Sequence, residues 1–234
     1  MFEVYTVLLV HVGDVGAASD ALEDYLETIE GKSARYIQYC NMQCYLYWMT
    51  ENFDIAVKWG QEGEDLRISS NVDTVFTSAH NLALAQRDSG AVDKALVYFL
   101  MGVSMDEVLD PKLLDADRGG AFYGNIGRCL HLMGQVDSAI TCYKKSAKLL
   151  QTRLYDSNVE NQAYIRQWFG ELLKRRGDVE NSIIFMEAAF AKWKVVSIPK
   201  AEKVKRDLYA EYPEWVMPLD FAASERRAVA WIMA

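Results

Sequence analysis

The hydrophobic and polar positions of the chain follow a helical pattern that recurs along the sequence. In three copies a helical stretch ends at a glycine, Gly90, Gly134 or Gly177, and a valine two positions later opens a second helical stretch. Apolar residues in the second stretch stand four, three, four and three positions apart, which places them on one face of an α-helix. The stripes expected to be buried are Val136, Ile140, Tyr143, Ala147 and Leu150 in one copy and Val179, Ile183, Met186, Phe190 and Trp193 in the next.

Small residues mark the places where paired helices are expected to cross closely. They recur at one position of the first helix and one of the second, and the turn glycines are expected to adopt positive φ at little cost. The small residues are Ala83, Gly127 and Gly170 in the first helices and Ala95, Ala139 and Ser182 in the second. The sequence therefore predicts antiparallel helix pairs joined by tight turns.

The turn glycines lie 44 and 43 residues apart, and the pattern extends in weaker form to both ends of the chain. Glu51 takes the place of the glycine in an earlier copy, and Gly13-Asp14 competes with Gly16 for the turn before it. The apolar opening Val4–Val10 is too short to span a bilayer and is expected to be a buried helix segment. We expect one array over residues 1–234, with about four to five repeats: 1–32, 33–71, 72–110, 112–154 and 157–196, followed by one or two closing helices over 199–234.

Residues 125–134, Asn-Ile-Gly-Arg-Cys-Leu-His-Leu-Met-Gly, carry the clearest likeness to a known family. They resemble the tetratricopeptide-repeat (TPR) superfamily, and the long period is similar to that of kinesin light chains and of bacterial sensor arrays. The resemblance implies an all-α fold, a right-handed α-solenoid whose first helices line a concave groove that holds peptides. The chain departs from the pattern at Ala79 and Arg166, where the copy between them has the aromatic Tyr123.

The resemblance also implies which side chains face that groove. These positions hold Asn41, Tyr45, Trp48, His80, Asn81, Arg87, Asn125, Arg128, His131, Gln167, Lys174 and Arg175, with Leu84, Trp168 and Glu171 on the same face. Asn81 and Asn125 are the best candidates for holding a ligand, because one amide can donate to and accept from a peptide backbone. The alternative is that both asparagines are solvated surface residues.

Arg128, Lys174 and Arg175 could pair with an acidic peptide or a carboxylate, or could be solvated cations without a ligand. The carboxylate clamp of chaperone-binding relatives is not matched. Its places are occupied here by His80, Leu84, Asn125, Tyr164 and Trp168. A co-chaperone function is therefore not expected.

The formal charge of −8 and a pI near 5.0 argue against nucleic acid or an anionic membrane as partner. A basic or neutral partner fits better. The four cysteines follow no secretory signal, which favours a cytoplasmic location.

No metal, cofactor or catalytic motif is expected. Cys40 and Cys44 stand one helical turn apart but lack further ligands nearby, so buried small hydrophobic residues are the favoured interpretation. Cys129 and His131 would point about 200° apart on a helix and cannot serve one centre.

These observations predict a non-enzymatic scaffold that binds a protein or peptide in its groove. The alternative is a sensor or oligomerisation module of a larger assembly, because the apolar stretch Ala228–Met233 would allow homo-oligomers to form through the end of the array. The aromatic stretch from Tyr36 to Trp59 is expected to be core, with part of it lining the groove or meeting another subunit as the alternative.

Overall fold

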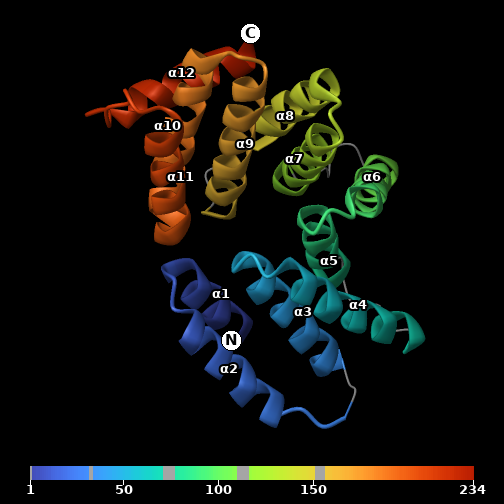
Figure 1. Ribbon diagram of the computed structural model, residues 1–234. Helices are drawn as coiled ribbons and strands as arrows, with labels where there is room; N and C mark the ends of the chain where they lie inside the picture. The colour runs from blue at the N-terminus through green and yellow to red at the C-terminus, as the bar shows by residue number, and fades with distance from the viewer. Residues whose placement is uncertain (1, 32–33, 71–76, 110–115, 151–155) are drawn as a thin grey trace. The chain divides into compact units, whose positions relative to one another are not determined.

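The computed structural model describes residues 2–31, 34–70, 77–109, 116–150 and 156–234, and their regular structure is entirely α-helical (Figure 1). The chain divides into two compact units, residues 1–99 and 100–234. The first unit holds α1 (Phe2–Val12), α2 (Val15–Glu27), α3 (Ala34–Met49), α4 (Phe53–Ser69), α5 (Thr77–Asp88) and the start of α6 (Val92–Leu109). The second holds the rest of α6, α7 (Ala116–Leu132), α8 (Val136–Leu150), α9 (Asp156–Arg175), α10 (Val179–Val196), α11 (Ile198–Glu211) and α12 (Phe221–Met233).

Five helix pairs are joined by the same kind of turn within the described residues. The turn residues have positive φ: 91° at Gly13, 63° at Glu51, 100° at Gly90, 77° at Gly134 and 79° at Gly177. In four of the turns the next backbone N–H donates to the carbonyl five residues back, as from Gln135 to Leu130 at 2.8 Å. The predicted turns are confirmed, the first one falls at Gly13 rather than Gly16, and Glu51 adopts the conformation of the glycine it replaces.

In the first unit, the core lies between the helix pairs α1–α2 and α3–α4. It is built from Val10, Ala18, Leu22, Tyr25, Tyr39, Cys40, Met42 and Leu46. The expectation that the apolar opening is buried was wrong for part of the segment, since the side chains of Tyr5 and Leu8 are more than half exposed. Only one face of α1 meets α2 and α3, so a helix that is apolar on all sides leaves its other face uncovered.

The small residues of the second unit lie where the helices of a pair meet. A Cβ atom added to Gly127 would stand 2.6 Å from the Tyr143 ring, and one added to Gly170 would stand 2.7 Å from Met186. The predicted stripes are buried at Tyr143, Ala147 and Leu150 and from Met186 to Trp193. Val179 is an exception at 49% exposed, because it lies at the first turn of α10, outside the packed part of the pair.

The two closing helices are α11 and α12, close to the predicted bounds. Pro199 lies in the first turn of α11, where a missing N–H costs nothing. α11 packs on α10, while α12 packs on α10 and α8. The predicted repeat boundaries at 32–33, 71–72, 110–112 and 154 lie outside the described residues. The division into repeats of a single array therefore stays a prediction.

Candidate functional site

Two asparagines join the first helices of neighbouring pairs in the first unit. The Asn81 amide of α5 donates to Asn41 Oδ1 of α3 at 2.9 Å, across a separation of 40 residues. Within the described residues these side chains make no other hydrogen bond, so the amide N–H groups of Asn41 and the Oδ1 atom of Asn81 keep unused capacity. Together they offer one donor and one acceptor side by side, which is the complement of a peptide group.

A second link joins the same two helices near their carboxyl ends. The Trp48 indole N–H donates to Asp88 Oδ2 at 2.8 Å. The guanidinium of Arg87 donates to both oxygens of the same carboxylate, at 2.8 and 2.6 Å, and its side chain is 2% exposed. Arg87 is therefore a buried ion-pair partner in this structure rather than a cation presented at the surface.

Tyr45 of α3 contacts α1. Its hydroxyl lies 3.0 Å from His11 Nε2, and its ring centroid lies 5.8 Å from that of Trp48. His80 is different, because its ring packs edge-on against Tyr98 and Phe99 of α6 and so lies within its own helix pair. We refer to Asn41, which is 8% exposed, together with the partly exposed Tyr45 and Asn81, as the asparagine face.

The second unit also contains a side-chain link between two neighbouring first helices, formed by Arg128 and Glu171. Arg128 Nη1 of α7 donates to Glu171 Oε2 of α9 at 2.5 Å, across 43 residues, and its guanidinium lies 5.6 Å from the Trp168 ring centroid. Gln167 accepts from the Trp193 indole at 3.1 Å and donates to Glu171 at 3.3 Å. These groove candidates are therefore engaged with one another.

Asn125 does not repeat the arrangement of Asn81. Its amide donates to the Ala121 carbonyl of its own helix at 3.0 Å, and the residue is buried. The equivalent place on α9 holds Trp168, so no second asparagine stands opposite it. Asn81 and Asn125 occupy equivalent positions in the sequence pattern. Their different hydrogen-bond partners become visible only in the structure.

His131 is completely buried between α7 and α8. Its Nδ1 atom lies 3.3 Å from the Tyr143 hydroxyl and 3.4 Å from Arg128 Nη1, while Nε2 has no hydrogen-bond partner among the described residues. Burial, together with the charges of Arg128 and Arg175, lowers the pKa of the imidazole to about 4. His131 is thus neutral at physiological pH.

The two remaining cationic candidates lie at the end of α9. Lys174 pairs with Glu211 of α11 at 2.7 Å, and Arg175 is exposed. The acidic partners Asp88 and Glu211 were not predicted from the sequence. The offset of one repeat, 40 residues between Trp48 and Asp88, is the signal that could have found Asp88.

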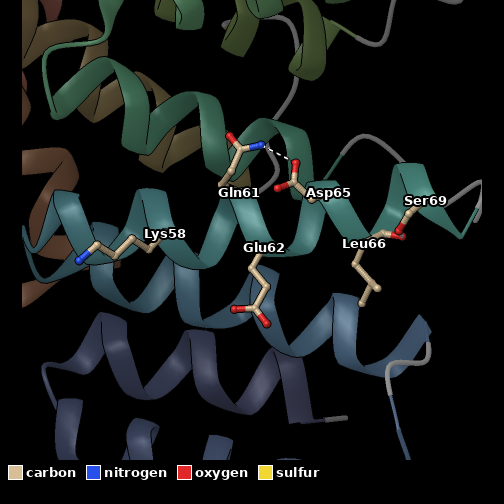
Figure 2. Close-up of a pocket in the computed structure, with 6 residues that line it drawn as sticks. All are labelled: Lys58, Gln61, Glu62, Asp65, Leu66 and Ser69. Atoms are coloured by element: carbon tan, nitrogen blue, oxygen red, sulfur yellow. Dashed lines mark hydrogen bonds between the residues drawn. The ribbon is translucent and has the colours of Figure 1, made fainter.

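An open pocket of about 650 Å³ lies along α4 (Figure 2). It is lined by Lys58, Gln61, Glu62, Asp65, Leu66 and Ser69, all from that one helix. Figure 2 shows the Gln61 amide turned toward Asp65, to which it donates at 2.7 Å, and Tyr36 donates to Glu62 at 2.8 Å. Both carboxylates are thus engaged in the protein's own hydrogen bonds.

The described residues contain no group of three or more His, Cys, Asp or Glu side chains arranged to hold a metal ion. Cys40 and Cys44 are buried, and burial raises the pKa of the Cys44 thiol to about 12. Among the described helices none has the length and apolar character needed to cross a membrane.

Comparisons with known proteins agree on the fold. Residues 121–149 match the tetratricopeptide repeat family model, and comparison with curated protein sequences finds no match. The crystal structure of nearly identical TPR-like repeats assigned to a kinesin light chain of Podosopora anserina is similar, with a TM-score of 0.53 and 16% identity over 82% of this chain and 94% of that chain. A variant of those repeats gives a TM-score of 0.54 and 15% identity, over 82% and 92%.

A further solved structure, NprR in complex with its cognate peptide NprX, has a TM-score of 0.48 and 11% identity over 97% of this chain and 76% of that chain. The family match falls on α7 and α8, the helix pair with the clearest repeat pattern in the sequence. The chain therefore has a TPR-like helical-repeat fold, with a recognisable tetratricopeptide repeat at residues 121–149.

Proposed function

We propose that this protein is a cytoplasmic, non-catalytic scaffold that binds an extended peptide segment of a partner protein on the asparagine face of its first unit. The observation that carries the proposal is the hydrogen-bonded pair Asn41–Asn81, which joins two neighbouring first helices and keeps a donor and an acceptor for a ligand. A peptide group offers the matching acceptor and donor whatever its side chain.

The surroundings of the pair support a peptide ligand. Tyr45 is partly exposed on the next turn of α3 and can contribute apolar contact beside the backbone hydrogen bonds. Trp48 is buried, and its ring centroid lies 5.8 Å from that of Tyr45, so it supports the Tyr45 ring. The Trp48–Asp88 link holds α3 and α5 at a fixed spacing, which lowers the ordering cost of binding. Helical-repeat proteins form solenoids with extended surfaces that they use for binding, in keeping with this proposal.

The test uses a panel of synthetic extended peptides and compares N41A/N81A with the wild-type chain. Two net hydrogen bonds are worth about 1–3 kcal/mol, so affinity should fall by roughly five- to 150-fold. N125A is the matched control, because Asn125 bonds to its own helix and should leave affinity unchanged.

A ligand methylated at its backbone nitrogens provides a second readout. Methylation removes the peptide N–H that would donate to Asn81 Oδ1. It should therefore weaken binding to the wild-type chain and have little effect on binding to N41A/N81A. Equal affinity of wild-type chain and N41A/N81A, with unchanged helical circular dichroism, would overturn the proposal.

A further inference from the structure

α12 is docked on helices that it does not directly follow. It makes its main contacts with α10 and α8 rather than with α11, the helix that precedes it. Ala228 and Ile232 are completely buried in the core formed with α8, α9 and α10. The Trp231 ring lies edge-on to Phe169 and Phe185, with centroids 5.4 and 5.5 Å away. The contacts recur on one face of α12, as in a helix bound in a groove.

Two buried polar groups fix the register of α12 in this groove. Arg166 of α9 is 1% exposed, and its Nε and Nη2 atoms donate to the two carboxylate oxygens of Glu225. Glu187 of α10 accepts from the Ser224 hydroxyl and, at 2.8 Å, from the Trp215 indole. Lys192 of α10 is a second, more exposed cation, 3.5 Å from Glu225. The groove thus contains two cations and the anion Glu187, which require a helix with the matching groups.

Arg166 would be a buried charge without its main partner if Glu225 were removed. Leaving one charge of a buried ion pair without its partner costs far more free energy than the intact pair contributes to stability. A helix in the wrong register, or with the wrong residue, is therefore disfavoured. This accounts for the departure from the repeat pattern at Arg166. An arginine replaces the aromatic residue where α12, rather than a further repeat, lies against α9.

The connection to α12 packs against the core at Trp215 and Met217 and is exposed at two other positions. Trp215 is held by Glu187 and is buried, whereas Val216 is 81% exposed and Leu219 is fully exposed. Met217, between these two exposed side chains, packs against the core that contains Trp215. Beyond Met217, Leu219 is exposed, so the groove contacts of α12 supply most of the packing that docks it.

We propose that the groove under α12 is a helix-docking site that also accepts α12 from a second copy of this chain, giving a dimer by reciprocal exchange. A second copy supplies Ser224, Glu225 and Ile232 in the same register, so no new complementarity is needed, and exchange in both directions closes the dimer. The attached α12 competes at high effective concentration, so exchange is favoured when the internal fit is broken. The proposal concerns the second unit and does not rest on peptide binding by the first.

The experiment mixes two charge-reversed full-length variants, R166E and E225R. In each variant alone, like charges meet between the groove and its own α12. In the mixture, each groove finds the opposite charge on the α12 of the other chain. Light scattering should report twice the chain mass in the 1:1 mixture, at concentrations at least tenfold below those at which either variant dimerises alone.

The exposed pair Arg227–Glu180 between α12 and α10 supplies the matched control. Its atoms lie 2.7 Å apart, but both side chains are more than half exposed. A mixture of R227E with E180R should remain monomeric. Dimerisation of this control mixture to the same extent, or a monomeric R166E/E225R mixture in which both chains keep their helical circular dichroism, would overturn the proposal.

A second measurement covers the case in which a charge-reversed chain fails to fold. W231A weakens the apolar docking of α12 without changing the charges, and a labelled peptide of residues 220–234 is then titrated onto this full-length chain. Binding of the native peptide at least tenfold more tightly than its E225R form supports the site. Equal binding of both, or binding of neither, overturns it. Peptide binding without exchange between chains would reject the second copy as the occupant.

Discussion

Trp48 and Asp88 stand 40 residues apart in the sequence and meet through a hydrogen bond of 2.8 Å between the first helices of two neighbouring pairs. The same carboxylate neutralises Arg87, whose side chain is buried. One aspartate thus satisfies two partners from two helices. Residues that stand one repeat apart in the sequence can therefore contact each other across two neighbouring first helices.

We expect Asp88→Ala to be strongly destabilising. It leaves the Arg87 guanidinium buried without its carboxylate and the Trp48 N–H without its acceptor, at a combined cost of about 2–4 kcal/mol. Urea unfolding followed by circular dichroism measures the change. Asp137→Ala is the control, because Asp137 is 95% exposed and its nearest Arg176 nitrogen is 3.7 Å away, so its removal should change stability by under about 0.5 kcal/mol. A similar effect of both substitutions would contradict the structural role of Asp88.

Gly127→Ala should destabilise the second unit by about 1–3 kcal/mol. The added Cβ would stand 2.6 and 2.7 Å from two atoms of the buried Tyr143 ring, which is held by its own packing against Phe169 and Trp168. Gly16→Ala is the matched substitution in α2, where the nearest atom would be 3.8 Å away and helix propensity favours alanine. Thermal unfolding should give a lower melting temperature for Gly127→Ala, and a higher one for Gly16→Ala, than for the wild-type chain. An unchanged melting temperature for Gly127→Ala would argue against close packing of α7 on α8.

The turns and helix pairs could be predicted from the sequence because their signals are local. A glycine at a turn and apolar residues four and three apart reflect backbone conformation and the burial of one helix face, and both act within a few residues. The same reasoning failed at Val179 and at Tyr5, where the pattern is apolar but no neighbouring helix covers the side chain.

The engagement of the candidate site residues could not be predicted in the same way. Asn81 and Asn125 occupy equivalent places, yet Asn81 bonds to Asn41 of the neighbouring helix and Asn125 to its own helix. An asparagine stands one repeat before each of them, Asn41 before Asn81 and Asn81 before Asn125, so the spacing alone does not tell which pair forms a hydrogen bond. Only the packing of neighbouring first helices reveals which polar side chains are already paired.

Glu51→Gly should leave the fold intact and raise its stability by about 0.5–1 kcal/mol. Glu51 has a φ of 63°, a conformation that costs a residue with a Cβ atom roughly 1–2 kcal/mol, partly offset by the larger unfolded-state entropy of glycine. The opposite change at an equivalent turn, Gly134→Ala, should destabilise by about 1 kcal/mol, since Gly134 has a φ of 77°. Chemical denaturation of both variants checks the pair. A loss of stability in Glu51→Gly would indicate that side-chain contacts of Glu51 outweigh the backbone strain.

His131 should make the stability of the second unit depend on pH between about 6.5 and 4. Its pKa is about 4 in the folded chain and 6.5 when unfolded, so between these values the unfolded state binds more protons than the folded state. Its contribution is constant above pH 6.5 and falls as the pH drops toward 4, by up to about 3 kcal/mol.

The comparison of wild-type chain with His131→Gln isolates this contribution. Glutamine keeps a polar side chain at the site but does not titrate, so the unfolding free energy of the variant should fall less steeply between pH 6.5 and 4, even if its value at pH 7 is lower. Urea unfolding at intervals across this range gives both slopes. Because Arg128 lowers the His131 pKa, Arg128→Gln should raise that pKa and shift the loss of stability to a smaller range of pH. Parallel curves for wild-type chain and His131→Gln would show that the buried imidazole is not the group that titrates.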